Sequence, residues 1–183
     1  MFYSPFNKKG FTLIEMLIAL TILLLVLVVG FNFYFYVNRA STVSSRQAAV
    51  QFNVRFAKEQ IEEIVRLADS MEIFQEWNAS LVNKSSDEAI YVDESGSLVH
   101  YQNGTPKNLL EGISEGIDYE ITFNTDDQVF LCYNISGMTD DGYTYEMSTE
   151  LKILNIAGDS GIIKNFGDEF TTGSAIVFSF DGN

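Results

Sequence analysis

The sequence predicts an α+β fold in which one long N-terminal helix packs on an antiparallel β-sheet. Three observations support this fold class: an apolar segment near the N-terminus, helical periodicity that continues beyond it, and strand patterns with turns after residue 78. With two prolines and 13 glycines in 183 residues, the chain is neither collagen-like nor a proline-rich disordered protein.

The charge of the chain is unevenly distributed. The formal net charge is −14, but residues 1–66 carry a net charge of +3 and residues 67–183 carry −17. A surface that binds nucleic-acid phosphates must be basic, so we do not expect direct nucleic-acid binding. The sequence therefore predicts a basic, apolar N-terminal part that carries an acidic globular part.

The first predicted element is a membrane-spanning helix. Phe11 to Val37 contains a single charged residue, Glu15. As a helix this segment is roughly 40 Å long, which exceeds the hydrocarbon core of a bilayer. Lys8 and Lys9 precede it, which predicts a cytoplasmic N-terminus. An ordinary signal peptide has a shorter apolar region and a small-residue cleavage site, and a plain anchor leaves Glu15 unexplained.

The segment Lys8-Lys9-Gly10-Phe11-Thr12-Leu13-Ile14-Glu15 resembles the processing motif of type IV prepilins and type II secretion pseudopilins. The resemblance implies that residues 1–10 are a leader peptide and that prepilin peptidase cuts after Gly10. It also implies that Phe11 is then N-methylated and that Glu15 is the fifth residue of the mature chain, with Lys8 and Lys9 as the basic charges of the leader.

The same resemblance implies a function in filament assembly. Residues 11–37 are then both membrane anchor and filament core, and the globular domain is extracytoplasmic in a prokaryote. The implied partners are other pilins or pseudopilins, prepilin peptidase and the inner-membrane assembly platform. Within a filament, Glu15 of one subunit can pair with the Phe11 ammonium of its neighbour, which removes most of the cost of two buried charges and sets the register.

Residues 38–77 continue the helical pattern as an amphipathic helix. We expect one helix from about Phe11 to Met71, and the alternative is two helices with a bend near Gly30 or 41–45. Its apolar stripe consists of Phe52, Phe56, Ile61, Ile64, Val65, Ala68 and Met71. Of these, we expect the last four to face the sheet, and Phe52 and Phe56 to contact other helices in a filament.

Residues 78–183 predict a β-rich globular domain. The expected strands are Ala89–Val92, Leu98–Tyr101, Ile117–Phe123, Val129–Ile135, Tyr143–Ile156 and Ala175–Phe180, with a hairpin turn at 93–96. This order, with the segment 109–113 between strands, is similar to pilin globular domains and to J-type minor pseudopilins in particular. That similarity implies a pilin-like fold and a minor subunit that initiates the filament or lies at its tip.

The sequence contains few residues suited to catalysis. One cysteine and one histidine exclude a disulfide framework within the chain and any site that needs two histidines. We expect His100 to be an ordinary strand residue, Cys132 to be buried, and the acidic pairs at 126–127 and 140–141 to lie in solvated turns. The four N-x-S/T sequences, which begin at Asn78, Asn83, Asn103 and Asn134, are expected in surface loops.

We therefore expect a structural subunit, with no enzymatic activity, no cofactor and no metal site. An alternative function is a binding pilin at the tip of a filament that contacts a surface, DNA or a secreted substrate. A membrane-anchored enzyme is a third possibility, and it would require a set of catalytic groups that the sequence does not display.

Overall fold

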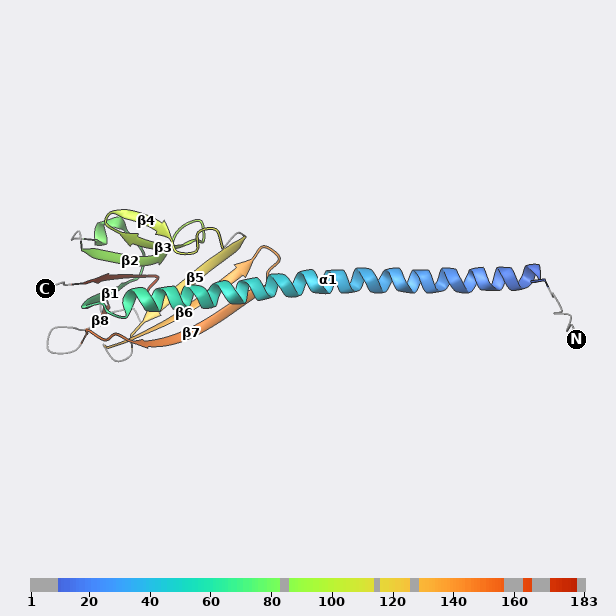
Figure 1. Cartoon of the computed structure of the whole chain (residues 1–183). Helices are drawn as coiled ribbons and strands as arrows, with labels where there is room; N and C mark the ends of the chain where they lie inside the picture. Colours follow the sequence, from blue (N-terminus) through green and yellow to red (C-terminus); the bar gives the residue numbers. More distant parts are fainter. Residues whose placement is uncertain are drawn as a thin grey trace, which may run out of the picture. The chain divides into compact units, whose positions relative to one another are not determined.

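The computed structural model describes residues 10–82, 86–113, 116–125, 129–156, 163–165 and 172–180. The elements are, in chain order, α1 (Leu13–Val65), β1 (Ser70–Phe74), the short 3₁₀ helix η1 (Ala79–Leu81), β2 (Asp87–Val92), β3 (Leu98–Gln102), β4 (Thr105–Asn108), β5 (Ile117–Asn124), β6 (Phe130–Thr139), β7 (Thr144–Lys152), β8 (Ile163–Asn165) and β9 (Ala175–Ser179). The predicted fold class, a long helix packed on antiparallel strands, is confirmed (Figure 1).

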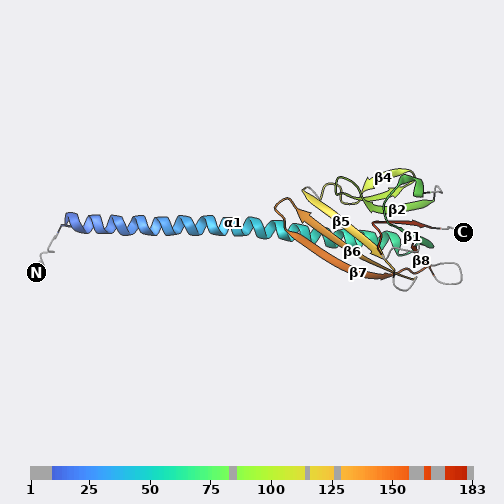
Figure 2. The same ribbon diagram turned by 180° about the vertical axis from the view of Figure 1, so that it is seen from behind.

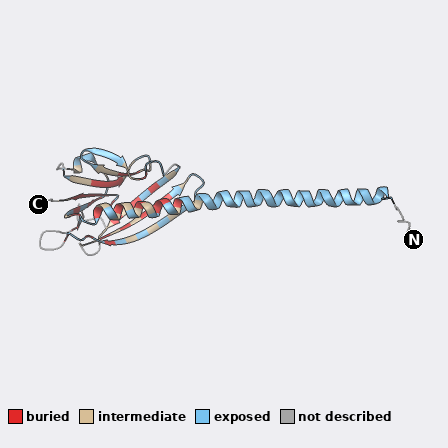
Figure 3. Cartoon of the chain, viewed as in Figure 1, coloured by how far each residue is buried: buried red, intermediate tan, exposed pale blue. Residues whose placement is uncertain are grey.

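Helix α1 is a single helix of 53 residues. It continues through Gly30 and through residues 41–45, so the alternative of two helices is wrong. Residues 10–46 are all exposed, and the buried helix positions begin at Val50 (Figure 3). Contacts divide the chain into two compact units at the same place, between Arg46 and Gln47.

The predicted C-terminal end of the helix is wrong. Instead of continuing through 66–77, α1 ends at Val65, and Ser70–Phe74 forms strand β1. Ala68 and Met71 are buried as expected, but from a turn and a strand. The spacing of these two residues suits a helix, whereas the alternation of Ser70, Met71, Glu72 and Ile73 suits a strand. Pairing with β9 selects the strand.

The strands form two sheets. The larger sheet has the order β4-β3-β2-β9-β1-β8, and the smaller has the order β5-β6-β7. Neighbouring strands are antiparallel except for β1 and β8, which pair in parallel. Figures 1 and 2 both show β5, β6 and β7 running alongside the C-terminal part of α1. Six strands lie where the sequence predicts them, although β6 extends further and β7 ends earlier, whereas β1, β4 and β8 were not predicted.

The core lies between α1 and the two sheets. The buried apolar residues of α1 recur every three to four positions: Val50, Val54, Ala57, Ile61 and Val65. They share one cluster with residues of both sheets, among them Ile90, Leu98, Ile121, Leu131 and Ile135. The expectation that Ile64 faces the sheet is only partly met, because its side chain is half-buried at the edge of this cluster.

One glycine joins the two sheets. Gly173 exchanges two backbone hydrogen bonds with Phe123 of β5, and the next residue, Ser174, donates its N–H to the carbonyl oxygen of Phe74. A Cβ atom at Gly173 would lie 2.3 Å from that oxygen, closer than atoms can approach. A glycine is therefore required where the chain passes from the smaller sheet to the larger one.

Candidate processing and assembly site

The first turn of α1 is closed by two side chains of the predicted motif. Glu15 Oε2 accepts hydrogen bonds from the backbone N–H of Thr12, at 2.8 Å, and from its hydroxyl, at 2.9 Å. In return, the N–H of Glu15 donates to Thr12 Oγ1 at 3.3 Å. This reciprocal arrangement is a capping box, which satisfies backbone donors at the start of a helix. It holds the Glu15 carboxylate beside the first turn, where the helix dipole favours a negative charge.

The predicted cleavage position precedes this turn. Gly10 and Phe11 are exposed and lie before the first helical residue, Leu13. A Cβ atom at Gly10 would meet nothing within 4 Å, so the residues that the structure describes leave the Gly10–Phe11 bond open to a peptidase. The leader lysines, Lys8 and Lys9, lie outside the described residues.

The remainder of the candidate site is the apolar surface of the same helix. From Leu13 to Val37 the side chains are exposed, and Glu15 is the only charged residue among them. Within the described part of the chain, α1 is the one helix that is long and apolar enough to cross a membrane. The hydroxyl of Thr21 is satisfied inside the helix by the carbonyl oxygen of Leu17, at 2.8 Å. Such a surface requires lipid or other apolar helices as its environment.

His100 has the structural role that the sequence predicts. Its Nε2 lies 2.7 Å from Glu88 Oε2 on the neighbouring strand. The other carboxylate oxygen, Oε1, accepts a hydrogen bond from Gln102 at 2.6 Å. The His100 ring also lies against that of Phe178, with centroids 6.2 Å apart. These contacts fix a strand pair and bring no nucleophile to the imidazole.

The cysteine and the acidic pairs named in the sequence analysis lie in different parts of the fold. Cys132 is half-buried on β6, so the expectation that it is buried is met only in part. Asp140 and Asp141 are exposed in the turn after β6, as expected, while 126–127 and Asn83 lie outside the described residues. No group of three potential metal-ligating side chains occurs in the part of the chain that the structure describes.

The described N-x-S/T sequences lie partly in surface turns and partly in a strand. Asn78 is exposed and caps η1 by accepting the N–H of Ser80, and Asn103 is exposed in the turn between β3 and β4. Asn134, however, lies within β6, so the expectation of a surface loop is wrong at that position.

One residue of the site was missed by the sequence interpretation. Thr12 was quoted as part of the motif without a role, yet it is the partner of Glu15 in three side-chain hydrogen bonds of the capping box. The signal was present, because threonine followed three residues later by glutamate is the sequence signature of a capping box.

Comparisons with known proteins found a similarity at the N-terminus and a similarity in fold. Residues 5–31 match the model of the prokaryotic N-terminal methylation motif. No curated protein matches the chain. A solved structure, that of a mutant of the PilB minor pilin from Streptococcus sanguinis, is similar with a TM-score of 0.58 at 15% sequence identity. The similarity covers 74% of this chain and 36% of that protein, so this chain spans about a third of its length.

An exposed apolar helix, long enough to cross a membrane, therefore begins with the prokaryotic N-terminal methylation motif and continues into an α+β unit. The methylation motif and a fold shared with a minor pilin both agree with the resemblance to type IV prepilins that the sequence shows.

Proposed function

We propose that the chain is a structural subunit that is cleaved between Gly10 and Phe11, N-methylated on Phe11 and assembled through α1. The product is a type IV pilus or a type II secretion-like pseudopilus, in which this chain is a minor subunit at the start or tip. The observation that carries the proposal is the methylation motif at the beginning of a helix whose first part, Leu13–Val37, is apolar and exposed.

The proposed topology follows from the same features. The leader with Lys8 and Lys9 stays in the cytoplasm, residues 11–37 cross the membrane once, and the acidic globular part is extracytoplasmic. Prepilin peptidase and the inner-membrane assembly platform are the proposed partners before assembly, and other pilins are the partners afterwards. The chain acts by packing against its neighbours, and no catalytic step is assigned to it.

The proposed contact between subunits is electrostatic as well as apolar. Cleavage creates an ammonium group on Phe11, and Glu15 of a neighbouring subunit can accept its hydrogen bonds. Both hydrogen bonds from Thr12 go to Oε2 of Glu15. Among the described contacts, Oε1 is therefore the carboxylate oxygen at which a neighbour's ammonium group can donate. A charge pair surrounded by apolar helices is favourable only when both partners are present, so this contact selects one register between subunits.

Mass spectrometry of the protein from cells with an active prepilin peptidase tests the proposal. We expect a mature chain that begins at Phe11, carries a methyl group there and lacks residues 1–10. Gly10→Val should block cleavage, because it adds a branched side chain at the bond to be cut. Gly30→Val is the matched control: it makes the same substitution inside α1, away from the Gly10–Phe11 bond and with open space around it, and it should be processed normally. An intact chain that still begins with Met1 would refute the processing step.

A further inference from the structure

The turn between β3 and β4 contains the only Asn-Gly sequence of the chain, Asn103-Gly104. Gln102 pairs with Thr105 across the two strands, so these two residues alone make the turn. The φ angle is 52° at Asn103 and 78° at Gly104. A type I′ hairpin turn requires a positive φ at both central residues, and Asn-Gly is a preferred sequence for it. The fold therefore accounts for the presence of both residues, and their reactivity is a further property.

Both residues of this turn are open to water. Asn103 and Gly104 are exposed, and no hydrogen bond among the described residues involves the Asn103 amide or the Gly104 N–H. A Cβ atom built on Gly104 would meet nothing within 4 Å. Because glycine has no side chain beside its nitrogen, that nitrogen can approach Cγ of Asn103 without steric hindrance.

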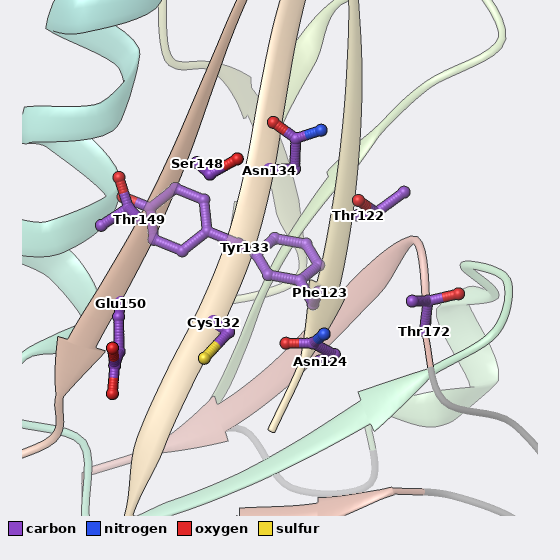
Figure 4. Close-up of a pocket in the computed structure, with 10 residues that line it drawn as sticks. All are labelled: Thr122, Phe123, Asn124, Cys132, Tyr133, Asn134, Ser148, Thr149, Glu150 and Thr172. Carbon is purple, nitrogen blue, oxygen red and sulfur yellow. The ribbon is translucent and has the colours of Figure 1, made fainter. Parts of the chain in front are cut away.

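Three other asparagines show what distinguishes Asn103. Asn78 is also exposed, but its Oδ1 accepts hydrogen bonds from the N–H and the hydroxyl of Ser80, and an alanine follows it. Asn124 and Asn134 lie on the neighbouring strands β5 and β6, where they line a pocket (Figure 4). Their amide oxygens are screened from water, and a β-branched residue follows each of them. Of the four, only Asn103 combines an exposed, unrestrained amide with a following glycine.

We propose that Asn103 is a modification site that deamidates spontaneously. The Gly104 nitrogen attacks Cγ of Asn103 and closes a cyclic imide, while the bond from Cγ to Nδ2 breaks. Nδ2 leaves as ammonia and takes the proton of the Gly104 N–H. Water then opens the ring: addition at Cγ gives aspartate, and addition at the main-chain carbonyl carbon gives isoaspartate. Water is consumed and ammonia is released, so the modification needs no other reactant and does not depend on filament assembly.

The two products differ in their effect on the hairpin. Aspartate suits the same turn, because Asp-Gly is also a type I′ sequence. Isoaspartate carries the main chain through its side-chain carbons, so the turn becomes longer than the pairing of Gln102 with Thr105 allows. Strand β4 is the terminal strand of the larger sheet, and the first three of its four residues are exposed. The isoaspartate product therefore loosens β4 and leaves β3 as a sheet edge, where unpaired backbone groups favour association with other chains.

Peptide mass spectrometry of the full-length chain, incubated in detergent at neutral pH and physiological temperature, tests the proposal. We expect the peptide that contains Asn103 to gain about 1 Da and to separate into two products, aspartate and isoaspartate. The peptides that contain Asn78, Asn124 and Asn134 should keep their masses. A synthetic peptide of residues 98–108, in which no fold restrains the turn, sets the incubation time. An Asn103 that is still intact in the protein when this peptide has converted completely would overturn the proposal.

Two matched variants test the role of the glycine. Gly104→Ala places a Cβ atom beside the attacking nitrogen and should slow ammonia release about tenfold or more. Gly142→Ala is the control, because Gly142 also has a positive φ, 83°, and open space around it, so the substitution brings similar strain in another turn. It should release ammonia at the rate of the unmodified chain. Equal rates for the two variants would overturn the assignment to Asn103 and Gly104.

Hydrogen exchange measures the effect on β4. In the isoaspartate fraction of the incubated chain, separated by chromatography, the amides of β4 should exchange faster than in the unmodified chain, because this strand opens locally. Asn103→Asp reproduces the other product and should exchange at the unmodified rate. Equal protection of β4 in the isoaspartate fraction and the unmodified chain would overturn the proposed loosening of the hairpin.

Discussion

Truncation of Ile61 tests the packing of α1 on the sheets. Ile61 is completely buried among residues of both sheets, near the C-terminal end of the buried stripe of the helix. Ile61→Ala removes three carbon atoms and leaves a cavity, for which buried aliphatic truncations cost about 2–5 kcal/mol. The better helix propensity of alanine offsets only about 0.4 kcal/mol of this loss. We therefore expect a net loss of about 2–4 kcal/mol in the free energy of unfolding.

The assay is urea unfolding of a fragment that begins at residue 38, followed by circular dichroism. We expect this fragment to be soluble, because every buried helix residue lies at or beyond Val50. With a urea dependence of roughly 2 kcal/mol per molar, the midpoint should fall by roughly 1–2 M. Residue 64 is half-buried, so Ile64→Ala should give an intermediate loss.

Phe52→Ala is the matched control on the same helix. The side chain of Phe52 is 60% exposed, and its ring stacks on Phe56 with centroids 6.1 Å apart. We expect a loss below about 1 kcal/mol in the isolated fragment, because little buried area is removed. In filaments we expect the opposite ranking of the two variants, because Phe52→Ala removes contacts between helices. Phe52→Ala should therefore reduce incorporation more than Ile61→Ala does. A loss below about 0.5 kcal/mol for Ile61→Ala, or equal losses for the two variants, would refute the packing described above.

Three further predictions concern other parts of the chain. Glu15→Leu should leave processing intact but reduce recovery in sheared filaments roughly 10²–10³-fold, with Glu15→Gln intermediate; equal recovery of all three proteins would remove the charge-pair argument. Gly173→Ala should destabilise the folded fragment by about 1–3 kcal/mol in the urea assay, since its Cβ atom meets the Phe74 carbonyl oxygen. Burial raises the pKa of Tyr119 to about 12 in the folded chain. The neutral phenol therefore contributes fully to the free energy of unfolding below about pH 10, and this contribution is lost as the pH rises toward 12. Unfolding free energies measured across this range should fall less steeply for Tyr119→Phe.

The parts of the fold that local patterns determine could be predicted from the sequence. The hairpin of β2 and β3 follows from two apolar runs that flank a turn with Asp93 and Gly96, and the structure shows why both are needed. Asp93 Oδ1 accepts the N–H groups of Ser95 and Ser97, and Gly96 adopts a φ of 73°. The motif at 8–15 is equally local, which is why the candidate processing site was readable without the fold.

The parts that distant pairing determines could not be predicted. The end of α1 depends on β9, because the N–H of Asp69 donates to the carbonyl oxygen of Ser179, at the far end of the chain. The positions of Ala68 and Met71 are compatible with the periodicity of a helix and with that of a strand. Only the pairing with β9 decides that this segment is a strand. The hydrogen bond from Asn134 to Glu146 is likewise invisible in the sequence, because these residues become neighbours only through the register of β6 and β7.

In the assembly proposed above, the capping box of Thr12 and Glu15 explains how one charge can serve both the membrane-anchored subunit and the filament. A glutamate in the middle of an apolar helix would be costly in a membrane, but this one lies in the first turn, where the helix dipole and two hydrogen bonds from Thr12 support its charge. The anchored subunit can therefore wait in the bilayer without an outside partner. Support within the subunit goes to Oε2 alone, so an ammonium group that approaches Oε1 adds to the capping box instead of competing with it. In the proposed assembly, Thr12→Val removes the two capping-box bonds that use the hydroxyl but keeps the Glu15 charge, so it should reduce recovery in sheared filaments only slightly. Glu15→Leu removes the carboxylate of the capping box and the proposed charge pair together, so its loss of recovery should be much larger, and equal losses for the two variants would contradict this reasoning.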